Sequence, residues 1–262
     1  MIFKDQLNRE VEIIEFPKRI VSLVPSQTEL LFDLGLEEEV IGITKFCIHP
    51  KIWHQTKTRI GGTKKVNIHK IKSLNPDLII CNKEENTKEE IELLANNFPV
   101  WISDIKNLSE ALDMIKGIGE ITGKSEKAAL LIKKIKSEFS ALKPLKTEKK
   151  ALYLIWKEPW MSVNSETFIH DMLVKCGFTN VTQSNILRYP ELTKKELVQL
   201  NPDYVFLSSE PFPFKEKHIK ELQEVLPKAE IKLVDGEAFS WYGSHLLKSG
   251  AYFKELIQLC SD

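Results

Sequence analysis

The sequence predicts an α/β protein made of two Rossmann-like lobes with parallel sheets, joined by a single long α-helix. Three observations support this fold class: strand-like segments alternate with helical ones, one short motif occurs twice, and an amphipathic helix lies between the two copies. Strands that alternate with helices form parallel sheets, because each crossover helix returns the chain to the same edge of the sheet.

The repeated motif is Asn-Pro-Asp, placed between a helix and a strand. The first copy lies in IKSLNPDLII, residues 71–80, and the second in LVQLNPDYVF, residues 197–206. In both copies the proline ends an amphipathic helix, the aspartate closes the turn, and β-branched or aromatic residues continue as a strand. The copies are 126 residues apart, which corresponds to one lobe plus a linking helix.

Residues 107–143 predict two consecutive helices. In the first, apolar residues recur every three or four positions until Gly123, which is typical of a helix C-terminus. In the second, an apolar stripe alternates with lysine-rich faces until Pro144 ends the helix. We therefore expect three segments: an N-terminal lobe at 1–122, a linking helix at 123–144 and a C-terminal lobe at 145–262.

The first lobe begins its sheet at Arg19 to Val24, a short apolar run typical of a strand buried on both faces. Pro25 then starts a helix that Ser26 can cap, with Glu29 completing a capping box. Ligands of open α/β sheets bind at the carboxyl ends of strands, so this turn is a candidate ligand contact as well as a structural cap. The remaining strands of this lobe are expected at 40–43, 78–81 and 100–102.

The second lobe repeats this plan. A helix is expected from Thr167 to Cys176, and the strands are expected at 151–156, 204–207 and 231–234. Segments rich in proline, glycine and aromatic residues are expected to be loops. Across both lobes these loops are residues 45–53, 157–160, 187–190, 208–214 and 235–245.

The segment Gly117–Ser125 ends in Gly-Lys-Ser, as a phosphate-binding loop does, but Ile118 stands where that motif needs glycine. The segment also follows a helix instead of a strand. We therefore expect no phosphate site here, and we interpret the glycines as points of close helix packing.

The composition excludes several classes of function. Lys plus Arg and Asp plus Glu both number 37, so no basic field favours nucleic acid. No run of 18 apolar residues predicts a transmembrane helix. The six histidines are scattered and the four cysteines lack CxxC spacing, so no metal site is expected. The N-terminus has no basic start followed by an apolar core, so we expect a mature form given a new Met or a protein that stays inside the cell.

Aromatic residues collect in the expected loops. Such a lining, with few charges, suits a large, flat, partly apolar ligand better than a sugar phosphate or a free ion. The alternative is that the rings pack the loops onto the sheets. The residues concerned are Trp53, Trp156, Trp160, Trp241, Tyr189, Phe239 and Tyr242.

Several stretches resemble one family. PKRIVSLVPSQTELLFDLG, both Asn-Pro-Asp segments, the central helix and VDGEAFSWYGSHLL are similar to substrate-binding proteins of ABC importers for cobalamin, haem and ferric siderophores, the helical-backbone metal receptors. The resemblance covers nearly the whole chain. It is strongest to cobalamin-binding members, through Pro25, Thr28-Glu29 and Tyr189-Pro190. It implies a ligand cleft between the two lobes and capture of a metal chelate, cobalamin first, without enzymatic chemistry or a resident cofactor.

The resemblance also implies the site residues. The expected ligand contacts are Pro25, Ser26, Trp53, Gly62, Trp156, Trp160, Tyr189, Phe239, Trp241 and Tyr242. Family members dock on a permease through an acidic residue on each lobe, and the 126-residue offset pairs Glu84 with Glu210 and Glu90 with Glu216. We expect a monomer in the periplasm or at the cell surface.

Cys176 and Cys260 occupy helices that also carry cysteines in a cobalamin-binding relative. One disulfide between them is therefore one expectation, and four buried free thiols are the other.

The chain departs from the cobalamin-binding members at one place, because Gly61-Gly62-Thr63 stand where those proteins can place a tryptophan.

Three alternatives stay open. A haem or ferric siderophore could replace cobalamin, and for haem the candidate iron ligands are Tyr189, His49 and His245. The same architecture occurs in metal chelatases, so an intracellular enzyme acting on tetrapyrroles is an alternative of another class, although the scattered histidines disfavour it. The third is a cytoplasmic relative that binds its ligand without a transporter.

Overall fold

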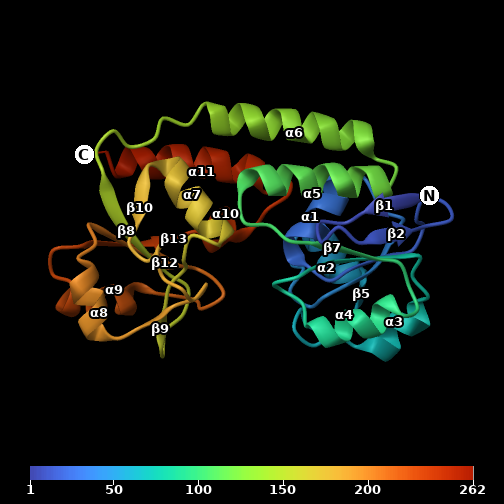
Figure 1. Ribbon diagram of the computed structural model, residues 1–262, viewed down its shortest axis with the longest axis horizontal. Helices are drawn as coiled ribbons and strands as arrows, with labels where there is room; N and C mark the ends of the chain where they lie inside the picture. Colours follow the sequence, from blue (N-terminus) through green and yellow to red (C-terminus); the bar gives the residue numbers. More distant parts are fainter. Residues whose placement is uncertain (262) are drawn as a thin grey trace. The chain divides into compact units, whose positions relative to one another are not determined.

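The computed structural model describes residues 1–261, which form two compact α/β units (Figure 1). Unit 1 comprises residues 1–105, 109–136 and 242–245, and unit 2 comprises the rest of the described chain. The division falls inside helix α6 (Ser125–Ser140), so this helix contributes to both units. The short segment 242–245 returns from the second half of the sequence to unit 1. The predicted fold class, α/β with parallel sheets, is confirmed.

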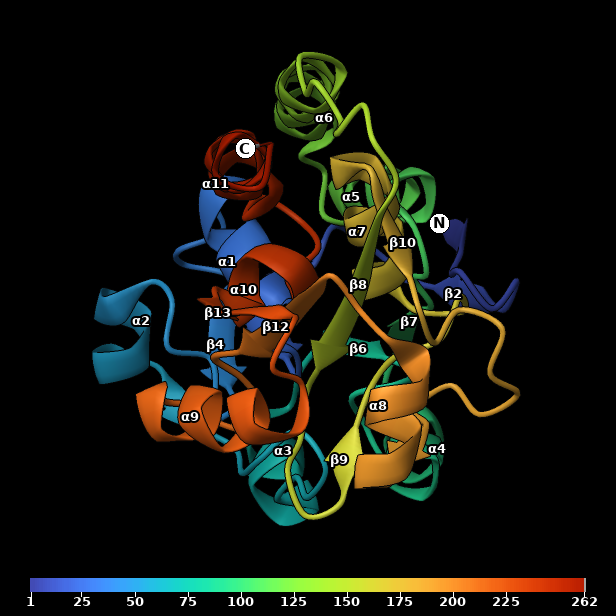
Figure 2. The ribbon, with the colours of Figure 1, turned by 90° about the vertical axis from the view of Figure 1, so that its left-hand side faces the viewer.

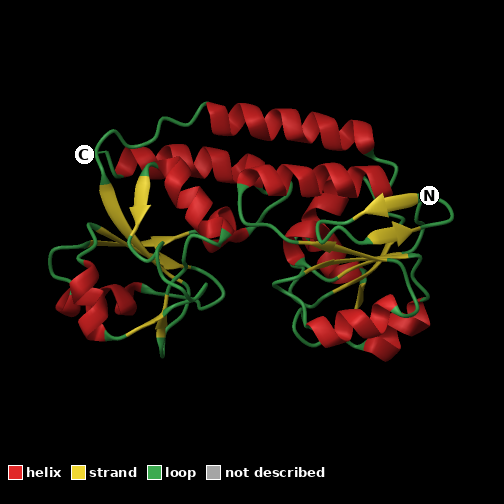
Figure 3. Cartoon of the chain, viewed as in Figure 1, coloured by secondary structure: helices red, strands yellow, loops and turns green. Residues whose placement is uncertain are grey.

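Unit 1 contains a five-stranded parallel sheet in the order β5-β4-β3-β6-β7. Figure 3 shows strands in yellow and helices in red. The order reverses between β3 and β6, because the chain first builds outwards from β3 on one side and then returns to build on the other. Such a reversal is the point where open α/β sheets bind ligands. The strands are β3 (Ile20–Ser22), β4 (Val40–Ile43), β5 (Thr58–Arg59), β6 (Leu78–Asn82) and β7 (Val100–Ser103).

Helices cover both faces of this sheet. Helices α3 and α4 lie on one face, and α1 and α5 lie on the other (Figure 1). Apolar side chains of β3, β6 and β7 pack with those of α3 and α4 in one buried cluster. The elements of unit 1 beyond its sheet are α1 (Pro25–Asp33), α2 (Lys51–Thr56), α3 (Ile68–Leu74), α4 (Lys88–Ala95), α5 (Leu108–Ile121) and the antiparallel ribbon of β1 (Ile2–Lys4) and β2 (Glu10–Glu12).

Unit 2 contains a four-stranded parallel sheet in the order β10-β8-β12-β13, which reverses between β8 and β12. Helices α8 and α9 lie on one face of the sheet, and α7 and α11 lie on the other (Figure 2). The elements are β8 (Lys149–Leu154), β9 (Trp160–Met161), α7 (Phe168–Cys176), β10 (Phe178–Asn180), β11 (Glu191–Leu192), α8 (Lys194–Leu200), β12 (Tyr204–Ser208), α9 (Glu216–Val225), β13 (Glu230–Val234), α10 (Gly236–Ser240) and α11 (Leu246–Leu259).

The two Asn-Pro-Asp motifs adopt the same local structure. Asn75 ends α3 with a φ of 45°, and Asn201 ends α8 with a φ of 42°. Both lie in the left-handed region, which asparagine tolerates better than most side chains do. The proline that follows cannot continue the helix, so the chain turns into β6 in unit 1 and into β12 in unit 2.

The aspartate of each motif binds the backbone of the neighbouring central strand. Asp77 accepts hydrogen bonds from the N–H groups of Lys18 and Arg19 at 2.8 and 2.9 Å, just before β3. Asp203 accepts one from the N–H of Lys150 at 2.7 Å, in β8. Each aspartate therefore joins the amino ends of the two strands between which the sheet order reverses.

The glycines of the segment that imitates a phosphate-binding loop pack helices closely, as predicted. A Cβ on Gly119 would lie 2.4 Å from the Cβ of Ala128, so α5 and α6 could not approach as they do. A Cβ on Gly117 would lie 2.9 Å from the ring of Trp101.

The structure corrects two loop assignments. The expected loop at 45–53 ends at Pro50, because α2 begins at Lys51 and carries Trp53 on a helix. The expected loop at 235–245 contains α10, which Asp235 caps by accepting the N–H of Glu237 at 3.0 Å. The sequence also gave no signal for β5, β9, β10 and β11, whose two or three residues are too few to show alternation. Within the described residues, no helix is both long and apolar enough to cross a bilayer.

Replacing Asp77 by Ala tests the role of the first motif. Two backbone N–H groups lose a carboxylate acceptor, so we expect the free energy of unfolding to fall by about 1–3 kcal/mol. Amide hydrogen exchange at Lys18 and Arg19 should accelerate selectively. Asp113→Ala, which removes an exposed carboxylate on α5, is the control and should leave both amides protected. Unchanged exchange in Asp77→Ala would show that the motif does not hold β3.

Candidate ligand-binding loops

We call the loops that follow the two central strands of each sheet the switch-point loops. In unit 1 they are residues 23–24 after β3, which lead directly into α1, and residues 83–87 after β6. In unit 2 they are residues 155–159 after β8 and 209–214 after β12. Because parallel strands end at the same edge of a sheet, these loops lie where ligands of this architecture bind.

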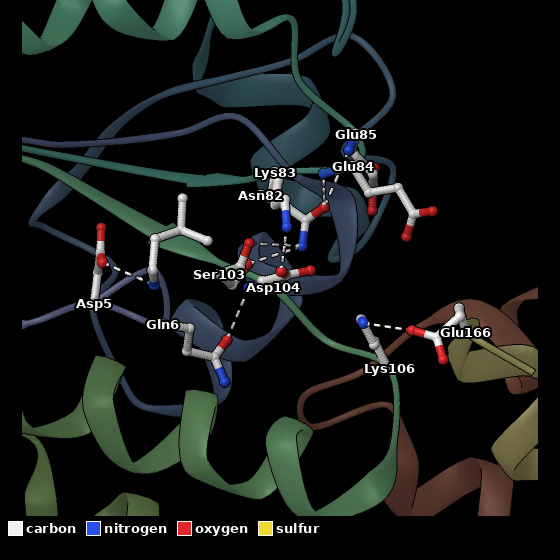
Figure 4. A network of polar contacts seen from close by, with 11 residues as sticks. Asp5, Gln6, Asn82, Lys83, Glu84, Glu85, Ser103, Asp104, Lys106 and Glu166 are labelled. Carbon is white, nitrogen blue, oxygen red and sulfur yellow. Dashed lines mark hydrogen bonds and ion pairs between the residues drawn. The ribbon is translucent and has the colours of Figure 1, made fainter. Parts of the chain in front are cut away.

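Buried side chains fix the unit 1 loops (Figure 4). Asn82, at the end of β6, donates to Ser103 Oγ at 3.0 Å and accepts the N–H groups of Glu84 and Glu85 at 2.8 and 3.0 Å. Gln27, on α1, donates to the same Ser103 Oγ at 2.5 Å. Asn82 is only 2% exposed, so this network is shielded from competing water and holds the loop backbone in place.

Asn86 extends this network to two further loops. Its Oδ1 accepts the N–H of Asn82 at 2.9 Å, and its Nδ2 donates to the carbonyls of Leu23 and Thr63 at 3.3 and 3.0 Å. One buried amide thus joins the loops that follow β3, β5 and β6. These loops are therefore built before any ligand arrives.

Segment 242–245 packs on the same part of unit 1. The Tyr242 hydroxyl donates to Glu85 Oε1 at 3.1 Å, and His245 Nδ1 lies 2.8 Å from Glu29 Oε2 on α1. Burial raises the pKa of Tyr242 well above its ordinary value, and the neighbouring Glu85 carboxylate raises it further. All four side chains lie in unit 1, where the segment closes over the start of α1.

Ser26 does not cap α1, which corrects the predicted capping box. The N-cap residue is Val24, and Pro25 takes the first helical position. Ser26 is therefore two residues past the N-cap position, from which a side chain binds the first free N–H groups. Ser26 is 2% exposed, so its side chain is enclosed within unit 1.

Unit 2 uses a carboxylate in its switch-point loops. Glu210 Oε1 accepts from Ser240 Oγ and from Trp241 Nε1, both at 2.8 Å. Burial raises the pKa of Glu210, and the two hydrogen bonds offset part of that rise. Glu210 and Glu84 occupy equivalent positions, two residues after the ends of β12 and β6. The N–H of Glu210 donates to Ser208 Oγ at 3.4 Å, and the N–H of Glu84 donates to Asn82 in the same way.

The structure sorts the predicted ligand contacts by exposure. Trp156 is 41% exposed, and Tyr189 and Gly62 are half-buried, so these three can touch a ligand as the chain stands. The others are buried: Pro25, Ser26, Trp53, Trp160, Phe239, Trp241 and Tyr242.

Three of the buried aromatic residues pack against other aromatic rings inside their units. Trp53 packs edge-on against Phe32 with ring centroids 5.3 Å apart, and Trp160 stacks on Phe214 at 6.1 Å. Phe239 is fully buried among the other aromatic rings of unit 2. This packing fits the alternative interpretation, that the rings pack the loops onto the sheets, and the ligand role of these residues stays a prediction.

Exposed aliphatic and aromatic side chains on other carboxyl-end loops were missed. Phe46 and Ile48, after β4, are 50% and 44% exposed, and Ile186 and Leu187, after β10, are 97% and 62% exposed. A single exposed apolar residue carries little information, because folded proteins expose many. The available signal was two adjacent aliphatic residues inside a polar loop.

The predicted docking glutamates differ in exposure. Glu84, Glu90 and Glu210 are half-buried, and Glu216, at the start of α9, is exposed. Glu90 Oε2 accepts the N–H of Val66 at 3.0 Å, so its carboxylate also holds the loop before α3.

The four cysteines are buried with free thiols, and His245 is buried as well. Cys176 and Cys260 are buried with free thiols; burial raises the pKa of Cys176, and the neighbouring Cys260 adds to the rise. His245 is 5% exposed beside Glu29, which removes it from the candidate iron ligands as the chain stands. No three His, Cys, Asp or Glu side chains among residues 1–261 converge as a metal-binding group.

A separate hollow of about 460 Å³ lies in unit 1 at the amino end of β7. It is lined by residues 9–12, 95 and 97–100. Because Val100 is the first residue of β7, this hollow is at the opposite edge of the sheet from the switch-point loops.

Known proteins resemble this chain in sequence and in fold. Residues 20–230 match the family model for periplasmic binding proteins. The chain is 30% identical over 212 residues to the uncharacterized ABC transporter substrate-binding lipoprotein YvrC of Bacillus subtilis, covering 77% of this chain and 67% of YvrC. The chain belongs to the periplasmic binding protein family.

Other proteins similar to this chain bind different ligands, so membership of the family does not identify the ligand of this protein. A vitamin B12-binding protein of Vibrio parahaemolyticus is 23% identical over 195 residues, covering 73% of this chain and 70% of that protein. The structure of the periplasmic heme-binding protein RhuT from Roseiflexus sp. RS-1 matches with a TM-score of 0.78 and 20% identity, over 94% of this chain and 98% of RhuT. This family comprises substrate-binding proteins of ABC importers and not enzymes, which excludes the chelatase alternative.

Replacing Glu210 by Gln tests the raised pKa in unit 2. A carboxyl group whose pKa is raised on folding binds protons more tightly in the folded state, so stability falls as pH rises above its ordinary value of 4.5. Gln keeps an acceptor for Ser240 and Trp241 but never ionises. We therefore expect Glu210→Gln to be more stable than the parent at pH 7, with the difference vanishing towards pH 4. Chemical denaturation across that range measures it.

The control is Glu216→Gln, which removes an exposed carboxylate of the same unit. It should leave the pH dependence of stability unchanged. A Glu210→Gln variant that is less stable than the parent at pH 7 would show that ionised Glu210 is needed to hold Trp241.

Proposed function

We propose that this protein captures cobalamin and delivers it to the permease of an ABC importer. The observation that carries the proposal is the exposure of large apolar side chains on the carboxyl-end loops of both sheets, in Phe46, Ile48, Trp156, Ile186 and Leu187. Apolar side chains held at the ligand-binding edge of a parallel sheet suit a large chelate with a methyl-rich surface. A free metal ion would need converging oxygen, nitrogen or sulfur ligands instead.

Cobalamin is favoured over the other chelates for two reasons. The vitamin B12-binding protein of Vibrio parahaemolyticus matches this chain along 73% of its length, whereas the haem-binding neighbour supports only the fold. Cobalamin also needs no protein ligand to its metal, and His245 is buried beside Glu29. Haem is the second candidate, because the half-buried Tyr189 is of a residue type that ligates haem iron.

Capture by this protein uses preformed loops. Asn82 and Asn86 fix the unit 1 loops with buried hydrogen bonds, so little backbone entropy is lost when the ligand binds. Side chains such as Trp156 then contribute apolar area without first leaving a packed core.

Docking and location follow the same proposal. Of the four candidate glutamates, Glu216 is the exposed one, so we propose that it contacts the permease from unit 2. The equivalent position in unit 1 is Glu90, whose carboxylate also binds Val66. As the relative YvrC is a lipoprotein, we propose that this protein acts outside the cytoplasmic membrane.

Titration of the protein with cyanocobalamin, haemin and a ferric hydroxamate tests the proposal. We expect saturable quenching of tryptophan fluorescence by cyanocobalamin alone, after correction for absorption by the ligand. Trp156→Ala should weaken cobalamin binding about tenfold, because it removes a large exposed aromatic contact. Val198→Ala, which trims an exposed apolar side chain on α8, is the control and should bind as the parent does.

Saturation by haemin with a shifted Soret band, lost in Tyr189→Phe, would move the assignment to haem. Saturation by the ferric hydroxamate alone would move it to siderophores. If none of the three saturates the protein, the chelate assignment is wrong.

A further inference from the structure

Ile186 and Leu187 form an apolar tip on the loop of unit 2 that links β10 to β11. Ile186 is 97% exposed and Leu187 is 62% exposed, and they are adjacent in the sequence. Isolated exposed apolar residues are common, but a contiguous apolar tip beside the exposed polar residues 183–185 is a feature of interaction sites.

The tip is held rigidly, so its exposure is a property of the fold. Three hydrogen bonds of 3.0 Å hold the loop against residues 162–164: Asn164 N–H donates to the Arg188 carbonyl, Asn164 Nδ2 donates to the Asn185 carbonyl, and Ser162 N–H donates to the Pro190 carbonyl. A loop tied at its base on both sides cannot easily fold its tip into the core.

A turn at Asn185 fixes the tip itself. Asn185 Oδ1 accepts the N–H of Leu187 at 2.9 Å, and the N–H of Asn185 binds the Thr182 carbonyl at 3.1 Å. The asparagine side chain therefore replaces a backbone turn at the position where the two aliphatic residues are displayed. Asn164, which holds the base, is itself 3% exposed and bound on its other side to the N–H of Glu166.

The loop emerges at the edge of the sheet that carries the switch-point loops. It follows β10, which pairs in parallel with β8, so the loop leaves the sheet at the same edge as residues 155–159. Trp156 in that neighbouring loop is also exposed. The apolar tip thus lies at the carboxyl edge of the sheet, where unit 2 is proposed to bind its ligand.

We propose that Ile186 and Leu187 are the principal apolar anchors for the chelate in unit 2 and set its preference for a methyl-rich macrocycle over a hydrophilic hydroxamate siderophore. This inference rests on the proposed function. Aliphatic side chains offer no hydrogen bond or metal ligand, so they favour the binding only of a ligand with an apolar edge. Because the loop backbone is already ordered, the favourable free energy of burying these two side chains is not offset by the cost of ordering the backbone, and it contributes to affinity.

The chain supplies matched controls for testing this inference. Ile14 is 99% exposed and Leu130 is 62% exposed, so they equal Ile186 and Leu187 in residue type and in exposure. Both lie in unit 1, in the segment before β3 and on α6 respectively. The test compares Ile186→Ser/Leu187→Ser with Ile14→Ser/Leu130→Ser in the full chain. Thermal unfolding should give equal midpoints for both double variants, because neither pair is packed.

Isothermal titration with cyanocobalamin and with a ferric hydroxamate then measures the effect. We expect the dissociation constant of cyanocobalamin to rise about 100-fold in Ile186→Ser/Leu187→Ser, about tenfold for each side chain, and less than about twofold in the control. The preference for cyanocobalamin over the hydroxamate should fall by the same factor.

Three results would overturn the inference. If the double variant binds cyanocobalamin as tightly as the parent, the tip is not a ligand contact. If its binding is unchanged but uptake through the permease is lost, the tip contacts the permease instead. Both results leave the proposed function intact. If the parent itself binds no chelate, the proposed function fails, and the inference fails with it.

Discussion

The hydrogen bonds of Asp77 and Asp203 hold together the two strands on which each unit depends. Asp77 joins the start of β6 to the start of β3, and Asp203 joins the start of β12 to the start of β8. In each unit these are the strands between which the sheet order reverses. Fixing their amino ends sets their register, and the register decides which residues leave the sheet at the carboxyl edge. The placement of the switch-point loops therefore depends on contacts at the opposite edge of the sheet.

The carboxyl edges of the two units are stabilised by different chemistry at equivalent positions. In unit 1 the buried amides of Asn82 and Asn86 bind loop backbone directly. In unit 2 the loop after β12 is held through the carboxylate of Glu210, which binds Ser240 and Trp241. An amide network is insensitive to pH, whereas a buried carboxylate is not. The two units share a fold but need not respond alike to acid.

The sequence predicted the parts of the structure that follow from local chemistry. Both Asn-Pro-Asp motifs, the central strands and the long helix were recognisable because proline, left-handed asparagine and apolar periodicity act within a few residues. The linking helix was expected at 123–144 and was overestimated at both ends, because α6 runs from Ser125 to Ser140. The two-unit organisation followed from the repeat.

The exposed residues of the candidate site were harder to predict, because the exposure of a side chain depends on distant packing. Trp53 and Phe239 looked like loop aromatics, but α2 and α10 have six and five residues and turn both rings inwards. Helices that short show no clear periodic pattern. Ile186 and Leu187 are exposed but were missed as candidate contacts. Their exposure depends on the hydrogen bonds of Asn164 and Asn185, which no local sequence pattern reveals.

Hydrogen–deuterium exchange with and without saturating cyanocobalamin shows whether the preformed loops at the carboxyl edges of the sheets bind a cobalamin-like chelate. We expect slower exchange at residues 23–24, 83–87 and 183–190, with little change in the hollow at residues 9–12 and 97–100. Protection confined to that hollow, or no protection of the three loops at saturation, would show that these loops do not bind the chelate.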